Sequence, residues 1–314
     1  MACAVSLGGC SPESAAITQP APNASQDMAV RVVVTRDFGQ QVLLDTIIEV
    51  PAGCSAMSAL EGVADVTTKY GGGFINSIDG LSSQYTGGQG GQCDWLVYMN
   101  GIQSKKGAAD YALRNGDTQQ WDFHDWSFRQ FTPATIGCYP QPFLSGYEGN
   151  LKPTVIVYEE DYAEKADELR GSLAYMGVAD VSTRTMAQLS ESDRQGANLI
   201  IIGTLGSNAL LSEMNGAWSR LGFFAEYSDG SITTYAGDGS VSSVYGEGTG
   251  LLQTTQSPWN PKGTGVCENV AWMVCGTDAA GVAAAVDVLI HRRDAIEHAF
   301  AAVVVGDSVI RIPQ

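Results

Sequence analysis

Histidine, positive charge and long apolar runs are all scarce in this sequence. Of 314 residues, three are histidine, and 17 Lys plus Arg stand against 34 Asp plus Glu, so the net charge is −17. A nucleic-acid partner is not expected, because such a chain has little positive surface with which to displace counterions from a phosphate backbone. No run of 18 apolar residues occurs, which excludes a membrane-spanning helix within these residues.

Motifs that carry catalysis or bind metals are missing as well. The sequence contains no C-x-x-C, no G-x-S-x-G, no Walker motif and no calcium loop of EF-hand spacing. His291, Asp294 and His298 would share one face of a helix that continued through residue 298, but a solvated helix face is the interpretation we favour. We therefore predict a protein that is not an enzyme, with no catalytic residue, no metal site and no resident cofactor.

What the sequence does contain is typical of a globular, exported protein. Apolar residues make up 44% of the chain and glycine is abundant at 37 residues. The length suits about two domains of roughly 150 residues each.

The first residues resemble the processing site of bacterial lipoproteins. Leu7-Gly8-Gly9-Cys10 matches a lipobox, in which cleavage precedes a cysteine that is then acylated. Residues 1–10 are interpreted as a truncated signal peptide, because six residues precede the box and none of them is Lys or Arg. Residues 11–27 are rich in Ser, Pro, Ala, Asn and Gln, which predicts a disordered tether. We expect an extracytoplasmic protein that contacts the cell membrane through a lipid on Cys10. A chance occurrence of this motif is the alternative.

Cysteine pairing stays open at the level of sequence. Cys3 lies in the predicted signal, and five further cysteines follow Cys10, so at most two disulfides can form among those five. One candidate pair is Cys267 with Cys275, and the other joins two of a set of three: Cys54, Cys93 and Cys138.

Residues 28–131 predict a first domain of the α+β class. Alternating apolar residues indicate a hairpin of strands over 28–35 and 41–50, and Ser55 can cap a helix that extends through Lys69. Shorter strands follow over 74–78, 93–99 and 118–125. A hairpin, a helix and further strands in this order are typical of a β-grasp fold.

Several residues of this first domain stand at a spacing that we can match to a known family: Trp95, Tyr98, Asn100-Gly101, Tyr111, Gly116-Asp117 and Trp121. The stretch from Val30 to Trp126 resembles a bacterial domain of uncharacterised function, itself similar to the C-terminal β-domain of transcobalamin and intrinsic factor. The resemblance implies a β-grasp fold and recognition of a corrinoid such as cobalamin. Candidate ligand contacts in this domain are Gly87, Gly88, Trp95, Tyr98, Asn100 and Tyr111. Core packing is the alternative role for the strand aromatics.

A second domain is predicted over residues 153–314, after a linker at 132–152 that contains three prolines. Strands over 153–158, 198–202 and 269–274 alternate with helices over 161–176, from 209, and over 276–291. This pattern predicts a three-layer α/β domain with an inserted β segment at 223–245. Stretches of this domain are similar to surface-layer proteins and to the periplasmic subunit of bacterial cellulose synthase, which implies a role in the cell envelope.

Two turns of the second domain join a strand to a helix through glycine, at 203–208 and 276–281. Ligands collect at such turns in open α/β sheets, and helix N-termini favour anions. Ser207, Asn208 and Thr277 are therefore candidate ligand contacts. Ordinary strand-to-helix turns, with Ser207 or Thr277 as helix caps, are the alternative, and we favour it.

Together these features predict a lipid-anchored binding protein that captures a small molecule between its two domains. Cobalamin is the named candidate, for uptake through a membrane transporter. The alternative is a structural envelope protein that interacts with wall polysaccharide or with a surface partner.

Overall fold

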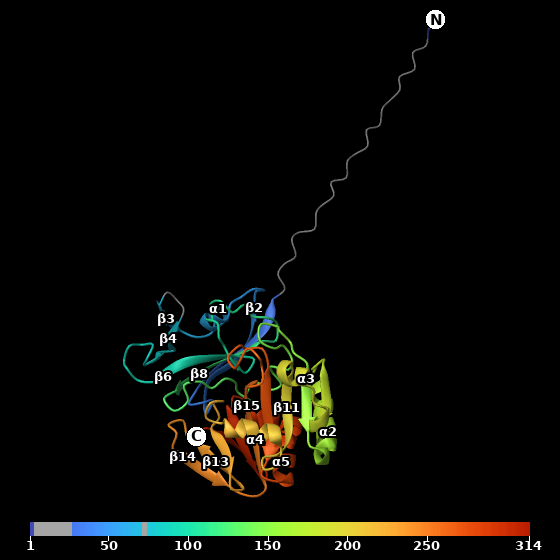
Figure 1. Ribbon diagram of the computed structural model, residues 1–314. Helices are drawn as coiled ribbons and strands as arrows, with labels where there is room; N and C mark the ends of the chain where they lie inside the picture. Colours follow the sequence, from blue (N-terminus) through green and yellow to red (C-terminus); the bar gives the residue numbers. More distant parts are fainter. Residues whose placement is uncertain (3–26, 71–73) are drawn as a thin grey trace.

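The computed structural model describes residues 1–2, 27–70 and 74–314, which fold around two main β-sheets (Figure 1). The predicted lipobox cysteine Cys10, and the predicted tether as far as residue 26, lie outside the described residues. No helix in the described part of the chain has the length and hydropathy needed to span a bilayer.

The first sheet has the strand order β2-β1-β8-β6-β7. Its strands are β1 (Met28–Arg36), β2 (Gln41–Val50), β6 (Cys93–Met99), β7 (Ile102–Gln103) and β8 (Thr118–Asp125). β1 and β2 form the predicted antiparallel hairpin, while β8 runs parallel to β1 and antiparallel to β6. These strands confirm the mixed α and β character of the first domain.

The first helix is shorter than predicted. α1 (Ala56–Glu61) begins after Ser55, whose side chain accepts a hydrogen bond from the Ser58 amide as expected, but the helix ends at Gly62. The following residues form β3 (Val66–Lys69), which pairs with β4 (Phe74–Ile78), and β4 pairs with β5 (Leu81–Ser82). The predicted helix through Lys69 is therefore wrong. Its last turn is rich in β-branched Val and Thr, which favour an extended backbone.

The two faces of the first sheet have different neighbours. Trp95 on β6 and Trp121 on β8 belong to the core that contains α1. Tyr98, three residues after Trp95, lies on the opposite face, because successive strand side chains alternate. There it packs with Phe38, Phe224 and Phe300, and the last two come from the second half of the chain.

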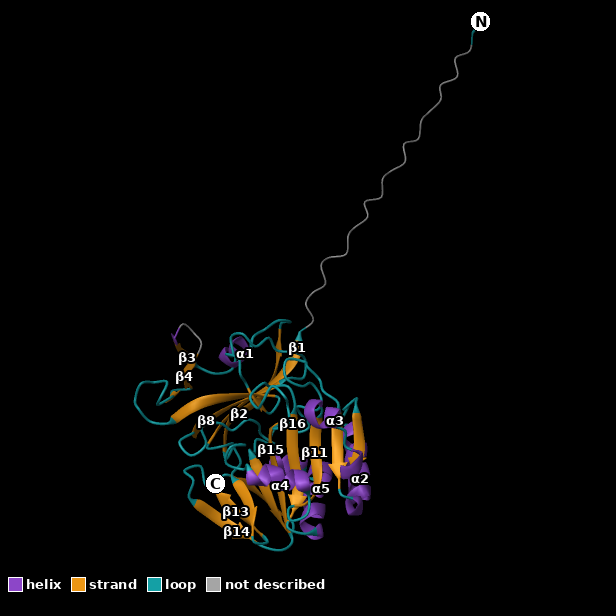
Figure 2. Ribbon diagram, viewed as in Figure 1, coloured by secondary structure: helices purple, strands orange, loops and turns teal. Residues whose placement is uncertain are grey.

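The second sheet is larger and has the order β10-β9-β11-β16-β15-β17-β18 (Figure 2). Its first four strands in that order are parallel and its last three are antiparallel. The bounds, in chain order, are β9 (Thr154–Tyr158), β10 (Val181–Thr185), β11 (Asn198–Thr204), β15 (Thr249–Gln256), β16 (Val270–Gly276), β17 (Ala301–Val305) and β18 (Ser308–Ile312).

Helices and an inserted sheet cover the second sheet on its two faces. α2 (Ala163–Tyr175) and α5 (Ala279–His291) pack with alternate residues of β9 and β11, such as Ile156 and Ile200. α4 (Ala209–Gly216) packs with the intervening residues, such as Val155 and Leu199, together with the inserted strands. The remaining elements are α3 (Glu191–Gly196), three 3₁₀ turns (Glu160–Tyr162, Met186–Gln188 and Arg293–Ile296) and the strands β12 (Ala225–Ser228), β13 (Ser231–Tyr235) and β14 (Val241–Tyr245).

The C-terminal end differs from the prediction in two ways. α5 ends at His291 and a short 3₁₀ turn follows, so His291, Asp294 and His298 do not share a helix face. His298 instead has a left-handed backbone with a φ of 66° and is buried. The closing hairpin of β17 and β18 was not predicted, although Gly306-Asp307 between two apolar runs is a turn signal.

The segment 132–152, predicted as a linker, is a packed connection. It contains neither a helix nor a named strand, yet Ile136, Phe143 and Tyr147 are buried within a core cluster that includes residues of both sheets. A Cβ on Gly137 would lie 2.4 Å from the His298 carbonyl carbon, so the backbone at Gly137 contacts the backbone at His298, a residue of the second half. The two halves are therefore held together and are not joined by a flexible spacer.

All five cysteines in the described residues are free thiols. Cys267 lies 3.3 Å from the carbonyl oxygen of Gln103, and Cys275 lies inside β16. Neither candidate pair is therefore formed: Cys267 and Cys275 are not bonded to each other, and no two of Cys54, Cys93 and Cys138 are paired. Burial raises the pKa of the Cys138 thiol to about 12.

Candidate ligand-binding groove

A groove of about 490 Å³ opens on the α1 side of the first sheet. This volume falls within the range of small-molecule sites, roughly 300–1,000 Å³. Its lining comes from α1, β4, β6, β8 and the loop after β7: Met57, Phe74, Ile75, Trp95, Leu96, Val97, Gln103, Ser104, Lys105, Lys106, Gly107, Ala108, Asp110 and Trp121.

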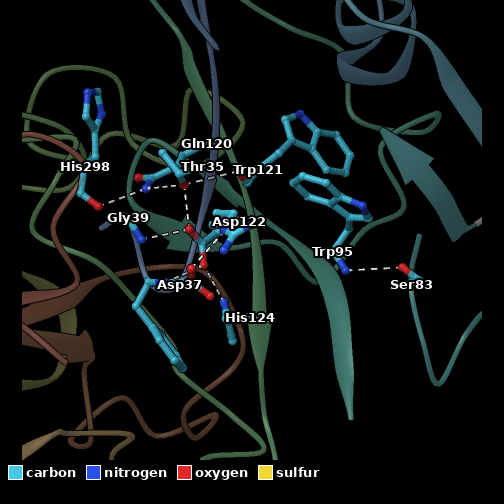
Figure 3. A network of polar contacts seen from close by, with 12 residues as sticks. Thr35, Asp37, Gly39, Ser83, Trp95, Gln120, Trp121, Asp122, His124 and His298 are labelled. Carbon is cyan, nitrogen blue, oxygen red and sulfur yellow. Dashed lines mark hydrogen bonds and ion pairs between the residues drawn. The ribbon is translucent and has the colours of Figure 1, made fainter. Parts of the chain in front are cut away.

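The base of the groove contains the indoles of Trp95 and Trp121, which come from neighbouring strands and lie near each other in Figure 3. The Trp95 indole N–H donates to the Leu81 carbonyl at 2.9 Å, and that of Trp121 donates to Gln119 Oε1 at 2.9 Å. Both N–H groups are satisfied by the protein, and the rings are largely buried in the core, with 8% of Trp95 and 2% of Trp121 exposed, so they form an apolar floor of small exposed area. Phe74 adds a ring at the rim and is 57% exposed.

The polar side of the groove is the loop from Gln103 to Asp110, which other segments hold in place. Ser104 Oγ is 2.8 Å from the Tyr147 hydroxyl, and Lys106 Nζ is 2.5 Å from Glu148 Oε1. Lys105 Nζ donates to the Val266 carbonyl oxygen at 2.6 Å. This side of the groove is thus tied to the packed connection and to a loop of the second half.

The three predicted aromatic contacts in the first domain occupy different places. Trp95 lines the groove, whereas Tyr98 is fully buried on the other face of the sheet. Tyr111 is buried against Tyr147, with ring centroids 5.2 Å apart, and its hydroxyl accepts from the Glu148 amide. Burial raises the pKa of both Tyr98 and Tyr111, as it would for phenols that pack in a core.

Asn100 has a structural role at a turn between β6 and β7. Its backbone is left-handed with a φ of 53°, a conformation that asparagine tolerates well. Its amide nitrogen donates to Asp117 Oδ1 and to the Gly146 carbonyl, both at 2.8 Å, and its oxygen accepts from the Thr118 amide. Burial raises the pKa of Asp117, with the bond from Asn100 opposing the shift. Because all these groups are engaged within the protein, Asn100 is not free to bind a ligand.

The glycine loop at Gly87 and Gly88 is not part of the groove lining. A Cβ on Gly87 would lie 1.9 Å from the Ser83 carbonyl oxygen, so glycine is needed there for close packing of the loop. The Gly87 carbonyl accepts from Lys69 Nζ at 2.7 Å. Gly88 has a φ of 81° and open space beside it.

The predicted contacts in the second domain are engaged within the chain. The Asn208 side chain accepts from the amides of Leu210 and Leu211, which caps α4. Thr277 Oγ1 lies within hydrogen-bond reach of the Gly246 and Thr249 carbonyls. The predicted caps, Ser207 and Thr277, are each wrong by one residue, because Asn208 caps α4 and Asp278 caps α5.

Ser207 lies beside a carboxylate. Its hydroxyl donates to Glu159 Oε1 at 2.8 Å, while Glu159 Oε2 accepts from the Thr204 amide at 2.9 Å. An anion approaching this turn would meet a negative charge and an amide that already has a partner. Asp278 likewise caps α5 by accepting from the Gly281 amide. The expectation of anion binding at these turns is therefore not supported by the geometry.

The two faces that were expected to close around a ligand are packed against each other. The rings of Tyr98 and Phe300 lie 5.1 Å apart, and those of Phe38 and Phe224 lie 4.9 Å apart. Gln120 Nε2 donates to the His298 carbonyl at 3.0 Å (Figure 3). This surface holds the halves together, and the groove lies on the opposite face of the first sheet.

Beside these rings lies a buried polar network centred on Asp122 (Figure 3). Its carboxylate accepts from the Thr35 hydroxyl at 2.6 Å and from the Phe38 and Gly39 amides at 3.0 and 2.8 Å. His124 Nδ1 lies 2.6 Å from the same carboxylate. The network fixes the turn between β1 and β2 against the interface. Across the described residues, no group of three or more His, Cys, Asp or Glu side chains is placed to hold a metal ion.

Sequence reasoning missed most of the groove, including Phe74 and the two lysines. A signal for the lysines was available, since an adjacent Lys-Lys pair is unusual in a chain this poor in lysine. For Phe74 the signal was weaker, because an aromatic residue at the start of a strand is more often buried.

Comparison with known proteins gives one match to a family. Residues 53–125 match the family model described as "Domain of unknown function (DUF4430)". The expected resemblance to a bacterial domain of uncharacterised function is confirmed over these residues. Every residue that lines the groove falls within them.

Other comparisons are more distant. No curated protein matches. Among solved structures, haptocorrin in complex with Cbi has a TM-score of 0.26 at 19% identity, over 33% of this chain and 27% of that chain. A candidate metal binding protein from Ruminococcus gnavus has a TM-score of 0.25 at 19% identity, over 31% of this chain and 97% of that chain. The present chain thus spans about a quarter of the haptocorrin chain.

Proposed function

We propose that this protein binds a small amphipathic molecule in the groove of its first domain, and that it acts by binding without catalysis. The observation that carries the proposal is the construction of the groove. Two indoles whose N–H groups are already bonded form its apolar base, and an anchored polar loop forms one side. Apolar pockets with a few fixed polar groups are the usual form of small-molecule sites.

A corrinoid such as cobalamin is the specific ligand we propose. Support comes from the spacing of Trp95, Tyr98, Tyr111 and Trp121, which resembles the transcobalamin-like β-domain. A corrinoid combines the apolar methyl groups of its ring with amide groups on its side chains, which suits a groove that has an apolar base and a polar side. Because a corrinoid exceeds a drug-sized ligand, a groove of about 490 Å³ would cover part of it and leave the rest outside.

The test is titration with cyanocobalamin, followed by calorimetry and visible absorption. We expect binding at micromolar protein, weakened by Phe74→Ala about 3- to 10-fold, since an exposed aromatic contact contributes roughly 1 kcal/mol. Phe74 is 57% exposed, so its loss costs the fold little. Tyr85→Ala is the matched control, because Tyr85 is 62% exposed and lies outside the groove lining.

Two outcomes would overturn parts of this proposal. Absence of heat and of a spectral change removes the corrinoid. Binding that is weakened by Tyr85→Ala and unaffected by Phe74→Ala removes the groove as its site.

We further propose that the protein works on the outer side of the cell membrane, held by a lipid on Cys10, and passes its ligand to a membrane transporter. The Leu7-Gly8-Gly9-Cys10 sequence supports this location. In cells that express the full chain, Cys10→Ser is expected to move the protein from the membrane fraction to the soluble fraction, while Cys3→Ser leaves it at the membrane. Equal fractionation of both variants would overturn the anchor.

A further inference from the structure

Two of the six lysines of this chain line the groove. The sequence has six: Lys69, Lys105, Lys106, Lys152, Lys165 and Lys262. Lys105 and Lys106 line the groove, and Lys105 reaches the Val266 carbonyl. Two residues beyond Val266, Glu268 pairs with Lys262 at 2.5 Å and is also influenced by Lys152.

Lys105 differs from Lys106, the other lysine of the groove lining, because no carboxylate neutralises its charge. Lys106 is paired with Glu148, and Lys262 is paired with Glu268. Among the described residues Lys105 forms no ion pair, and its one hydrogen bond goes to an uncharged carbonyl oxygen. An ammonium group has three N–H donors, so two remain for another partner. Lys105 thus presents a positive charge at the side of the groove.

The hydrogen bond to Val266 also preorganises the Lys105 side chain for binding. The bond to Val266 crosses from the first domain to a loop of the second half and restrains a long side chain that would otherwise sample many rotamers. A restrained donor loses less conformational entropy when a ligand arrives. The charged residues of the groove lining are Lys105, Lys106 and Asp110, and Lys106 is paired with Glu148, so Lys105 is the group there that attracts an anion and Asp110 is the charge that opposes it.

We propose that the ligand of the groove carries an anionic group, a carboxylate, phosphate or sulfonate, which Lys105 binds while the apolar part of the ligand lies on Trp95 and Trp121. This inference rests on the proposed function and narrows it to a class of ligand. It makes Lys105 a specificity-determining residue, because a neutral molecule of the same shape lacks the group that this ammonium would bind.

Two fluorescent probes of matched shape separate charge from apolar contact. Anilinonaphthalene sulfonate has an aromatic body with a sulfonate, and phenylnaphthylamine has the same body without it. Each is titrated into the full chain and into three variants. Lys105→Met removes the charge and keeps an apolar stem, Phe74→Ala trims the rim, and Lys165→Met removes a lysine from α2, away from the groove.

We expect the substitution of Lys105 to change the affinity for the two probes by different factors. Lys105→Met weakens the sulfonate probe about 3- to 10-fold and changes the neutral probe less than about 2-fold, as for one partly exposed charge contact. Phe74→Ala weakens both probes, and Lys165→Met weakens neither. Raising salt from about 50 to about 500 mM weakens the sulfonate probe in the parent chain and has less effect in Lys105→Met.

Different results would contradict the further inference and the proposed function. If both probes respond to Phe74→Ala and neither distinguishes Lys105→Met from the parent, the groove stands and its anion preference is overturned. If neither probe binds, or if Phe74→Ala changes neither, the groove is not a binding site and both proposals fall together.

Discussion

Replacing Asp122 with asparagine tests the polar network that fixes the interface between the two halves. One carboxylate oxygen accepts from the Phe38 amide and lies 2.6 Å from His124 Nδ1, and the other accepts from Thr35 Oγ1 and from the Gly39 amide. Whichever way the asparagine amide is oriented, its NH2 group faces one of the two main-chain N–H groups. A hydroxyl or an imidazole can exchange donor and acceptor roles, but a backbone amide cannot.

The expected loss of stability follows from the hydrogen bonds that an asparagine at position 122 cannot accept. A buried donor without a partner costs about 1–3 kcal/mol, and the remaining bonds lose the strength that an ionised acceptor gave them. We expect Asp122→Asn to destabilise the protein by about 3–4 kcal/mol. At about 2–4 °C per kcal/mol for a chain of this size class, Tm falls by roughly 10 °C.

The assay is chemical and thermal unfolding followed by circular dichroism, with Asp125→Asn as the matched control on the same strand. Asp125 accepts one bond, from the Ser127 amide, in an exposed position. Its replacement is expected to cost less than about 1 kcal/mol. If Asp122→Asn were as stable as Asp125→Asn, the reasoning about the buried carboxylate would be refuted.

Three further predictions follow from packing, thiol burial and titration. Gly137→Ala is expected to cost more than about 2 kcal/mol in urea unfolding, because a Cβ there would lie 2.4 Å from a backbone carbon, whereas Gly246→Ala, with nothing within 4 Å, changes stability by less than about 0.5 kcal/mol. In a chain that begins at residue 27, a thiol reagent is expected to modify Cys54 and Cys93, which are half-buried, and to reach all five thiols only in denaturant; no reaction of the native chain would contradict the free-thiol state. Burial lowers the pKa of His298 below its ordinary value of 6.5, with Asp45 opposing the shift, so the unfolded chain takes up this proton first and stability falls as the pH drops below about 6.5. His298→Gln is expected to reduce that decline, measured as urea midpoints at about pH 7 and pH 5, and an unchanged pH dependence would contradict it.

Most strands of the two sheets were predictable from the sequence because their signals are local. Alternation marks the hairpin of β1 and β2, and the continuous apolar run at Asn198–Thr204 marks a strand buried on both faces. The helix through Lys69 failed because Val63, Ala64 and Val66 suit a helical period and an extended segment equally well. The closing hairpin failed through an overlooked turn, for which the physics was available.

The groove was harder to predict because its residues meet through distant contacts. That Trp95 and Tyr98 lie on opposite faces could have been deduced, since an odd separation along a strand reverses the face. The position of Lys105 could not, because it depends on a bond to Val266, 161 residues later in the chain. No local pattern reports such a contact.

The first sheet also constrains what the second half can contribute to binding. One face of the sheet is covered by Phe224 and Phe300, so the second half cannot close over a ligand from that side. It reaches the groove instead along the edge, where the Val266 carbonyl holds Lys105 and where Cys267 Sγ lies 3.3 Å from the Gln103 carbonyl. Its contribution is therefore to hold the polar side of the groove in position.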